Sequence, residues 1–340
     1  MRPGASEAGP VSNVRRRQLS ALLLAAALPL PRAVRAQAER PRYRVIDFDW
    51  VDAARARAVP SRLYWPDAPA NASVPLVVFS HGIGGSRQGY SYLGKHWSSH
   101  GVASLHVQHI GSDAAVWRGN PFGVVGRLQA AAQESEAIAR AADVRFALDQ
   151  MLSAQTGAWG AAVDPRRLVA AGHSYGANTT LLSIGAQVMR QGRLVNCQDP
   201  RFAAAVVISA PPFYGETDLA AVLSPVSIPT LHVTATDDVI EIPGYRSGAA
   251  DRLAVFDAVG DPRKLLAVFR GGSHSIFTDR SLTGGATLNP QVKSATADLA
   301  LAFLDLTFRD DSAALSEWRQ TWQPILSRAP ATRFASSVHA

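Results

Sequence analysis

The sequence has almost no cysteine. Cys197 is the only one in 340 residues, so no disulfide can form within the chain, and nothing around it resembles a nucleophilic site. Internal repeats, low-complexity blocks and Pro/Ser-rich linkers are also lacking. A hydrophobic share of 47% and a charged share of 18% exclude a disordered or fibrous protein. The composition therefore indicates one globular domain that is held together by packing.

Net charge is also scarce outside the first 36 residues. Six arginines against one glutamate in that segment give +5 of the total +7, which leaves +2 for the rest of the chain. A domain so close to neutrality has no electrostatic footprint for nucleic acid, so nucleic acid is excluded as an expected partner.

Residues 1–36 predict a signal peptide. Three arginines at 15–17 precede an apolar run at 21–30, and small-residue cleavage sites follow it. The run is too short to span a bilayer. The paired arginines favour the twin-arginine route, with an ordinary Sec signal or a retained anchor as alternatives. We expect residues 37–340 to form a single exported domain, periplasmic or extracellular in a bacterium, with no stable transmembrane segment.

Short apolar runs alternate with helical patterns along this domain. Their continuity is typical of parallel strands covered on both faces. The runs lie at 76–80, 102–107, 168–172, 204–209, 230–235 and 265–269. The helical patterns lie at 90–100, 133–153, 178–190, 249–258 and 295–308. The alternation predicts an α/β fold with a doubly wound, mostly parallel sheet of about eight strands, edged by antiparallel strands at 43–50 and 58–65.

The strongest motif is Gly172-His173-Ser174-Tyr175-Gly176, a G-x-S-x-G sequence between a strand and a helix. A sharp turn there lifts the serine hydroxyl above the sheet, and the flanking glycines leave room for it. We therefore expect Ser174 to be a nucleophile.

An attacking serine creates an oxyanion, which needs positioned N–H donors. One donor is expected at Tyr175, the residue after the nucleophile. The loop at residues 80–86 follows an earlier strand and predicts the other donor at Ile83, with Gly82 or Gly84 as alternatives. A phosphate-binding loop is disfavoured because the glycine spacing fits neither dinucleotide nor P-loop patterns.

The general base must be chosen among nine histidines. His274 follows the last strand, where the order serine, acid, histidine places it. The acid should follow the strand at 230–235, where Asp238 is favoured and Asp237 is the fallback. His106 and His109 form an H-x-x-H pair with too few partners for a metal, so no metal site is expected.

Other side chains near the strand ends could line a pocket. Those predicted are His81, His173, His109, Trp117, Phe213 and Tyr214. Residues 111–126, with Trp117 and Phe122, are either a lid over the site or a plain surface loop.

The sequence resembles α/β-hydrolases related to platelet-activating factor acetylhydrolase and to bacterial dienelactone hydrolase-like esterases. The resemblance rests on four stretches: the first two predicted strands, the loop at residues 80–86 (the oxyanion loop), the turn at residues 172–176 (the nucleophile elbow), and the acid and histidine segments. It covers roughly residues 43–310. It implies an α/β-hydrolase fold and hydrolysis of a small or lipid-like ester through an acyl-enzyme, without a cofactor. In the family's G-T-x-D turn the acid falls on Asp238.

This chain departs from that pattern in two places. Ala235 replaces the usual glycine of the acid turn, and Ser174 stands where true dienelactone hydrolases have cysteine, so dienelactone turnover is not expected. Two other functions use the same residues or the same scaffold. One is a serine peptidase or amidase, and the other is a catalytically inactive binding protein.

Overall fold

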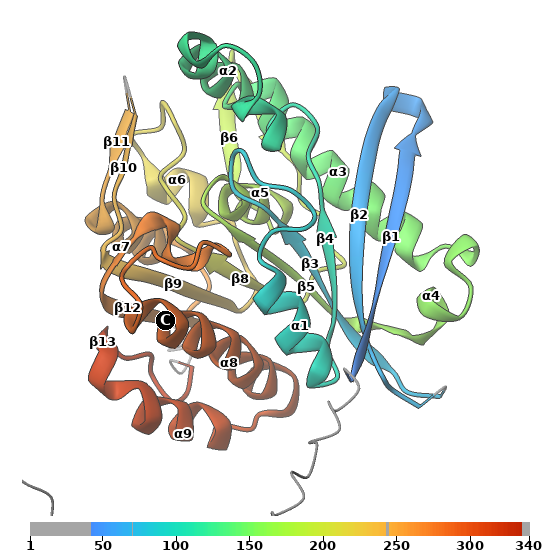
Figure 1. Cartoon of the computed structure of the whole chain (residues 1–340), viewed down its shortest axis with the longest axis vertical. Coiled ribbons are helices and arrows are strands. Elements are labelled where there is room, and N and C mark those ends of the chain that lie inside the picture. Colours follow the sequence, from blue (N-terminus) through green and yellow to red (C-terminus); the bar gives the residue numbers. More distant parts are fainter. Residues whose placement is uncertain (1–41, 70, 243–244, 335–340) are drawn as a thin grey trace, which may run out of the picture. The chain divides into compact units, whose positions relative to one another are not determined.

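A nine-stranded sheet carries the fold (Figure 1). The structure is a computed structural model that describes residues 42–69, 71–242 and 245–334. In these residues the strand order is β1-β2-β4-β3-β5-β8-β9-β12-β13. The strands are β1 (Tyr43–Asp52), β2 (Arg57–Pro66), β3 (Val74–Ser80), β4 (Ala103–Val107), β5 (Val163–His173), β8 (Ala204–Ile208), β9 (Thr230–Asp237), β12 (Lys264–Ser273) and β13 (Leu326–Arg328).

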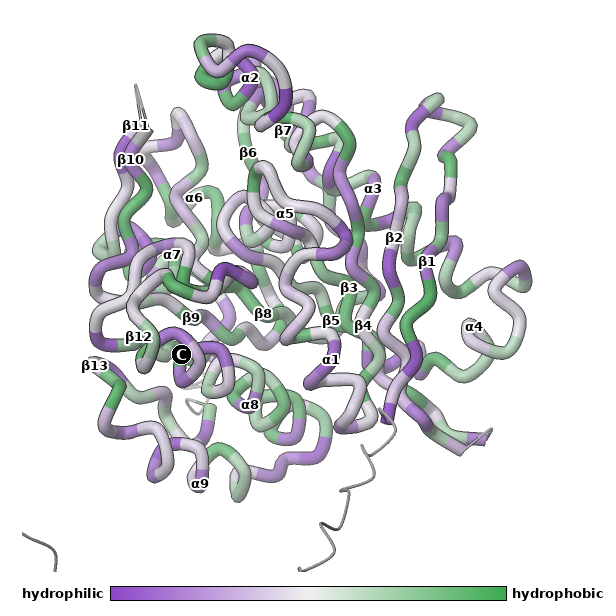
Figure 2. The backbone as a smooth tube through the Cα atoms, viewed as in Figure 1, coloured by the Kyte–Doolittle hydropathy of each residue, from purple (hydrophilic) through white to green (hydrophobic). Residues whose placement is uncertain are grey.

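The central strands β4, β3, β5, β8, β9 and β12 are parallel, as their continuous apolar runs predict. The predicted antiparallel edge is confirmed, because β1 pairs with β2 from Tyr43↔Pro66 to Asp52↔Arg57. At the opposite edge β13 pairs antiparallel with β12. Figure 2 shows apolar residues concentrated along the central strands.

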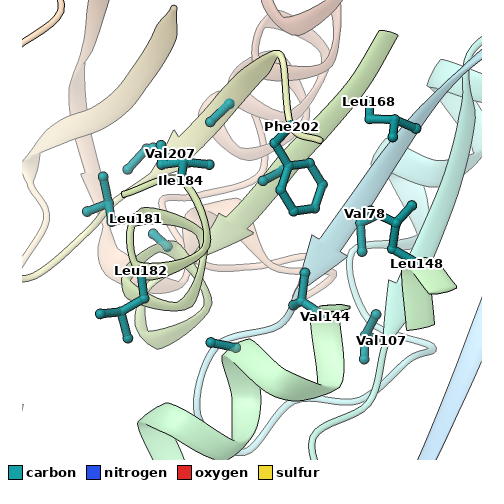
Figure 3. Close-up of a cluster of buried hydrophobic side chains, with 14 of the residues drawn as sticks. Val78, Val107, Val144, Leu148, Leu168, Leu181, Leu182, Ile184, Phe202 and Val207 are labelled. Carbon is teal, nitrogen blue, oxygen red and sulfur yellow. The ribbon is translucent and has the colours of Figure 1, made fainter. Parts of the chain in front are cut away.

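Helices cover both faces of the sheet. They are α1 (Ser91–Ser99), α2 (Val124–Ala131), α3 (Glu134–Leu152), α4 (Ala158–Ala162), α5 (Tyr175–Ser183), α6 (Leu219–Leu223), α7 (Ala249–Ala258), α8 (Leu288–Arg309) and α9 (Ala313–Trp322). Side chains of α3, α5, α6 and α7 share one buried cluster with the strands. Those of α1, α8 and α9 share the other. In Figure 3, Val144 and Leu148 of α3 point toward Val78 and Val107 of the sheet.

One predicted helix is wrong in its second half. Helix α5 ends at Ser183, and Gly185 then takes φ +122°, a backbone conformation that residues with a side chain rarely adopt. The chain continues as a hairpin of β6 (Gln187–Arg190) and β7 (Arg193–Asn196). Its two-residue turn has positive φ at Gln191 and Gly192, as a type I′ turn requires. A second short hairpin joins β10 (Ile240–Ile242) to β11 (Tyr245–Ser247).

The predicted signal peptide, residues 1–36, lies outside the described residues. Among the helices that are described, none combines the length and the apolar character needed to cross a bilayer.

Candidate active site

Ser174 sits on a sharp turn between β5 and α5. Its backbone has φ +57° and ψ −123°, a strained conformation for a residue with a side chain. The neighbouring glycines permit the turn. A Cβ on Gly176 would lie 2.0 Å from the Ser80 carbonyl oxygen, and one on Gly172 would lie 2.2 Å from the Gly176 carbonyl oxygen. The backbone thus presents Ser174 at the carboxyl ends of the parallel strands, where open α/β sheets bind ligands.

Three loops bring the predicted triad side chains together. Ser174 Oγ lies 2.8 Å from His274 Nε2. His274 Nδ1 lies 2.8 Å from Asp238 Oδ1. An aspartate can only accept from the imidazole, so Nδ1 carries the proton and Nε2 is free to accept the serine proton. This is the geometry of an activated nucleophile, an orienting acid and a base between them.

The structure distinguishes the two candidate acids. Asp238 is fully buried, and it also accepts a hydrogen bond from Thr234 Oγ1 at 2.8 Å. Asp237 is exposed and bonds to Thr236. Burial raises the pKa of the Asp238 carboxyl, but the hydrogen bond from His274 and the charges of His274 and Arg252 outweigh burial and hold that pKa well below its usual range. Asp238 therefore stays ionised beside the imidazole.

Ser209 is a fourth side chain in this group, and no motif in the sequence singles it out. It follows β8 with φ +53°, is 1% exposed, and its Oγ lies 2.8 Å from His274 Nδ1. Its hydroxyl also lowers the pKa of Asp238 by hydrogen bonding. Ser209 therefore helps to fix the orientation of the imidazole.

The backbone N–H groups of Ile83 and Tyr175, the two predicted oxyanion donors, differ from those of Gly82 and Gly84 in having no acceptor among the described residues. Gly82 N donates to Tyr90 Oη at 3.2 Å, and Gly84 N donates to the Ser112 carbonyl at 2.8 Å. Within the described part of the chain neither Ile83 N nor Tyr175 N has a hydrogen-bond acceptor. Tyr175 is the first residue of α5, where an N–H lacks an intrahelical partner. This elimination favours Ile83 over both glycine alternatives.

His173 connects these loops behind the nucleophile. Its Nε2 donates to the His274 carbonyl at 3.1 Å, and its Nδ1 accepts from Tyr90 Oη at 2.8 Å. Burial first, and then the charge of His274, hold the pKa of His173 well below its usual value, so the ring is neutral. His173 is 2% exposed and supports the site rather than lining a pocket.

The two other predicted lining histidines are His81, within the oxyanion loop, and His109, packed against His81, and burial removes both from any open pocket. His81 is 1% exposed and its Nε2 accepts from His109 N at 3.1 Å. His109 is fully buried between Asp143 and Ser80. His106 is equally buried, bonded to Ser104 and stacked on Phe79.

The aromatic residues predicted to line a pocket differ widely in exposure. Phe213 is 8% exposed and belongs to the apolar core. Trp117 is 51% exposed, and its indole N–H donates to the Gly84 carbonyl at 2.9 Å, so it lies against the oxyanion loop. Phe122 and Tyr214 are 95% and 74% exposed. The segment at 111–126 therefore contacts the oxyanion loop through Trp117 as well as through Ser112.

No group of three or more histidine, cysteine or acidic side chains in the described ranges is arranged to hold a metal. The strand order, the turn at Ser174 and the order of the strand-end loops are those of the α/β-hydrolase fold, as predicted.

The comparisons with known proteins agree with that fold. The family model of platelet-activating factor acetylhydrolase, isoform II, matches residues 62–118, which include the oxyanion loop. The ferulic acid esterase of Streptomyces cinnamoneus matches with a TM-score of 0.58 and 21% identity, over 82% of this chain and 93% of that one. No curated protein matches significantly in sequence. The chain has the α/β-hydrolase fold, and its residues 62–118 resemble platelet-activating factor acetylhydrolase, isoform II, as predicted. The resemblance to dienelactone hydrolases stays a prediction.

Proposed function

We propose that this chain is a serine hydrolase that cleaves carboxylic esters through an acyl-enzyme on Ser174. One observation carries the proposal: a continuous hydrogen-bonded path runs from Ser174 Oγ through His274 to buried Asp238, with both distances at 2.8 Å. The serine sits in the strained backbone of a nucleophile elbow. The match to the acetylhydrolase model supports an ester as the substrate.

The reaction divides into two halves. In the first, His274 Nε2 takes the Ser174 proton while Oγ bonds to the ester carbonyl carbon, and the N–H groups of Tyr175 and Ile83 bind the oxyanion. The tetrahedral adduct collapses as His274 gives its proton to the leaving alkoxide, which leaves an acyl-serine. In the second, His274 takes a proton from water, the hydroxide adds to the acyl carbon, and Ser174 regains the proton as the carboxylic acid departs.

We place the substrate among small or lipid-like esters. Trp117 lies against the oxyanion loop with half of its surface exposed, so it offers an apolar wall beside the reacting carbonyl. The acetyl group in the name of the matching family makes a short acyl chain the first to test.

The test uses the domain without its predicted signal peptide. A fluorophosphonate probe should label Ser174, and p-nitrophenyl esters of graded acyl length should be hydrolysed with a preference for short chains. Ser174→Ala should lose both labelling and nearly all turnover, by at least about 10³-fold, while keeping its thermal unfolding midpoint.

Other outcomes would point to other functions. Faster cleavage of a p-nitroanilide than of the matching ester would indicate an amidase or peptidase. A folded wild-type protein that neither reacts with the probe nor turns over any ester would indicate a binding protein and would defeat the proposal.

We also propose that the domain acts outside the bacterial cytoplasm, on the basis of the predicted signal in residues 1–36. Cell fractionation with an Arg15→Lys, Arg16→Lys variant tests this, since retention of the variant in the cytoplasm is expected of a twin-arginine signal.

A further inference from the structure

Arg140 is a fully buried cation in the middle of α3. No carboxylate of the described residues lies within 4.0 Å of its guanidinium. Two of the acids on its own helix, Glu136 and Asp143, pair with Arg57 at 3.1 and 2.9 Å. Burial lowers the pKa of Arg140 to about 10, so the guanidinium is still charged at neutral pH. An unpaired buried charge is costly unless hydrogen bonds replace its hydration. The contacts of Arg140 therefore indicate what it is retained to do.

One set of contacts fixes the oxyanion loop on both sides of Ile83. Arg140 Nη2 donates to the His81 carbonyl, two residues before Ile83. Its Nη1 donates to Ser112 Oγ at 2.7 Å, and the Ser112 carbonyl accepts from Gly84 N at 2.8 Å. The Ser112 hydroxyl donates a hydrogen bond to Glu136 Oε1 at 2.8 Å, which connects an acid to Arg140 indirectly. Ile83 N is thus held between two anchored neighbours.

A second set of contacts fixes the start of α5. Arg140 Nε donates to Thr179 Oγ1 at 2.9 Å, and Thr179 donates in turn to the Tyr175 carbonyl at 3.0 Å. The guanidinium carbon also lies 4.6 Å from the centre of the Tyr175 ring, a cation–π contact. The residue that supplies the second oxyanion donor is therefore held by the same side chain.

We infer that Arg140 is a positioning residue that sets the separation of the two oxyanion donors, Ile83 N and Tyr175 N. The inference rests on the proposed function, because an oxyanion forms only if Ser174 attacks a carbonyl. The donors belong to loops 92 residues apart in the chain. Arg140 spans both with one planar group, which lysine cannot do because its single ammonium lacks the fork of donors. Misplacing catalytic groups by about 1 Å costs about 10²-fold in rate.

The experiment compares three variants of the mature domain. Arg140→Met removes the charge and all three hydrogen bonds, and Arg140→Lys keeps the charge alone. Leu148→Ala, on the same helix and also fully buried, is the matched control, because Leu148 belongs to the apolar core, so its truncation opens a cavity there and removes none of the hydrogen bonds of Arg140. Each variant is measured for kcat and KM on p-nitrophenyl acetate, for inhibition by phenylboronic acid, and for thermal unfolding.

We expect Arg140→Met to lower kcat by about 100-fold with KM changed by less than about threefold, and Arg140→Lys to fall between it and the wild type. Phenylboronic acid forms a tetrahedral adduct on serine, so its inhibition constant should rise in step with the loss of kcat/KM. Leu148→Ala should lower the unfolding temperature and leave these constants nearly unchanged. A folded Arg140→Met protein with wild-type kcat and boronate affinity, or an equal loss in Leu148→Ala, would overturn the inference.

A second readout requires no turnover. Amide hydrogen exchange in residues 80–86 and 174–180 should be faster in Arg140→Met than in Leu148→Ala at matched stability, and equal exchange would refute the role of Arg140. The probe reaction at Ser174 of the wild type tests the proposed function separately. Failure of either idea can thus be recognised independently of the other.

Discussion

Two clusters in this molecule each join a serine, a histidine and an aspartate by hydrogen bonds. In the first, His274 lies 2.8 Å from both Ser174 Oγ and Asp238 Oδ1. In the second, His109 lies 3.1 Å from both Ser80 Oγ and Asp143 Oδ2. Each histidine points Nδ1 at the acid and Nε2 at the serine, so the two clusters share their connectivity.

The two clusters differ in solvent exposure and in the backbone conformation of the serine. Ser80, His109 and Asp143 are at most 1% exposed, and Ser80 ends an ordinary strand. Ser174 is 7% exposed on a strained turn, and the side chain of His274 is 17% exposed. The backbone N–H of Tyr175, next to Ser174, has no acceptor among the described residues, whereas Ser80 is packed against the turn of Ser174, since Gly176 approaches its carbonyl closely. A substrate carbonyl can therefore reach only one of the two serines.

The two clusters also differ in how their surroundings change the pKa values of their side chains. Burial, followed by the charges of Arg140, Arg57 and Arg55, holds the pKa of His109 well below its usual value, so that imidazole cannot act as a base. Burial raises the pKa of Asp143 despite its arginine partners, whereas that of Asp238 is lowered. Connectivity alone does not make a triad; solvent access and a stabilised imidazolium do.

The largest expected effect separates the adjacent aspartates of the reactive cluster. Asp238→Asn should lower kcat by about 10³- to 10⁴-fold, because the amide no longer holds the imidazole in the productive tautomer. Asp237→Asn, the matched control, should stay within about twofold. Steady-state hydrolysis of p-nitrophenyl acetate measures both, and comparable losses in the two variants would contradict the assignment of the acid.

A smaller effect is expected at Ser209. Ser209→Ala should lower kcat about fivefold, because losing one hydrogen bond to the imidazole removes about 1 kcal/mol. Ser183→Ala is the control, since Ser183 is also 1% exposed and its hydroxyl donates within its own helix, to the Thr179 carbonyl. The same assay measures both variants. Equal rates for the two would reduce Ser209 to a packing residue.

The smallest effect on rate is expected in the buried cluster. Ser80→Ala should change kcat/KM by less than about twofold, because this serine meets no substrate, yet it should destabilise the fold by about 1 kcal/mol through the lost partner of His109. Rates together with urea unfolding measure both quantities. A loss of rate comparable to that of Ser174→Ala would break the distinction between the clusters.

Much of the fold could be predicted from the sequence, because parallel strands buried on both faces need uninterrupted apolar runs. The elbow and His274 were predictable since each follows such a run. Asp238 was favoured as the acid, but Asp237 stayed as the fallback because adjacent residues share the same strand end, and burial separates the two only in the structure. The hairpin after α5 was missed because its strands are only four residues long and do not alternate between polar and apolar residues, so that Gly192 was the one sign of a tight turn.

Arg140 shows why the supporting residues were harder to find. An arginine within a helix is usually on the surface, and composition gives no hint that this one is buried. The position of Arg140 in the helix does give such a hint, because it lies on the same buried face of α3 as residues 144, 147, 148 and 151. Ser209 had no such signal, because a polar residue at a strand end is equally typical of a plain turn.

The close contact between Gly176 and the Ser80 carbonyl has a consequence for how this enzyme scaffold can change. The gap between nucleophile and oxyanion loop is as narrow as two backbones allow, so even one added methyl group would wedge the reaction centre apart. Trp117 and Tyr214, by contrast, stand on outer loops with much of their surface free. New ester preferences should therefore be sought by redesigning those loops, while the backbone at the centre is left untouched.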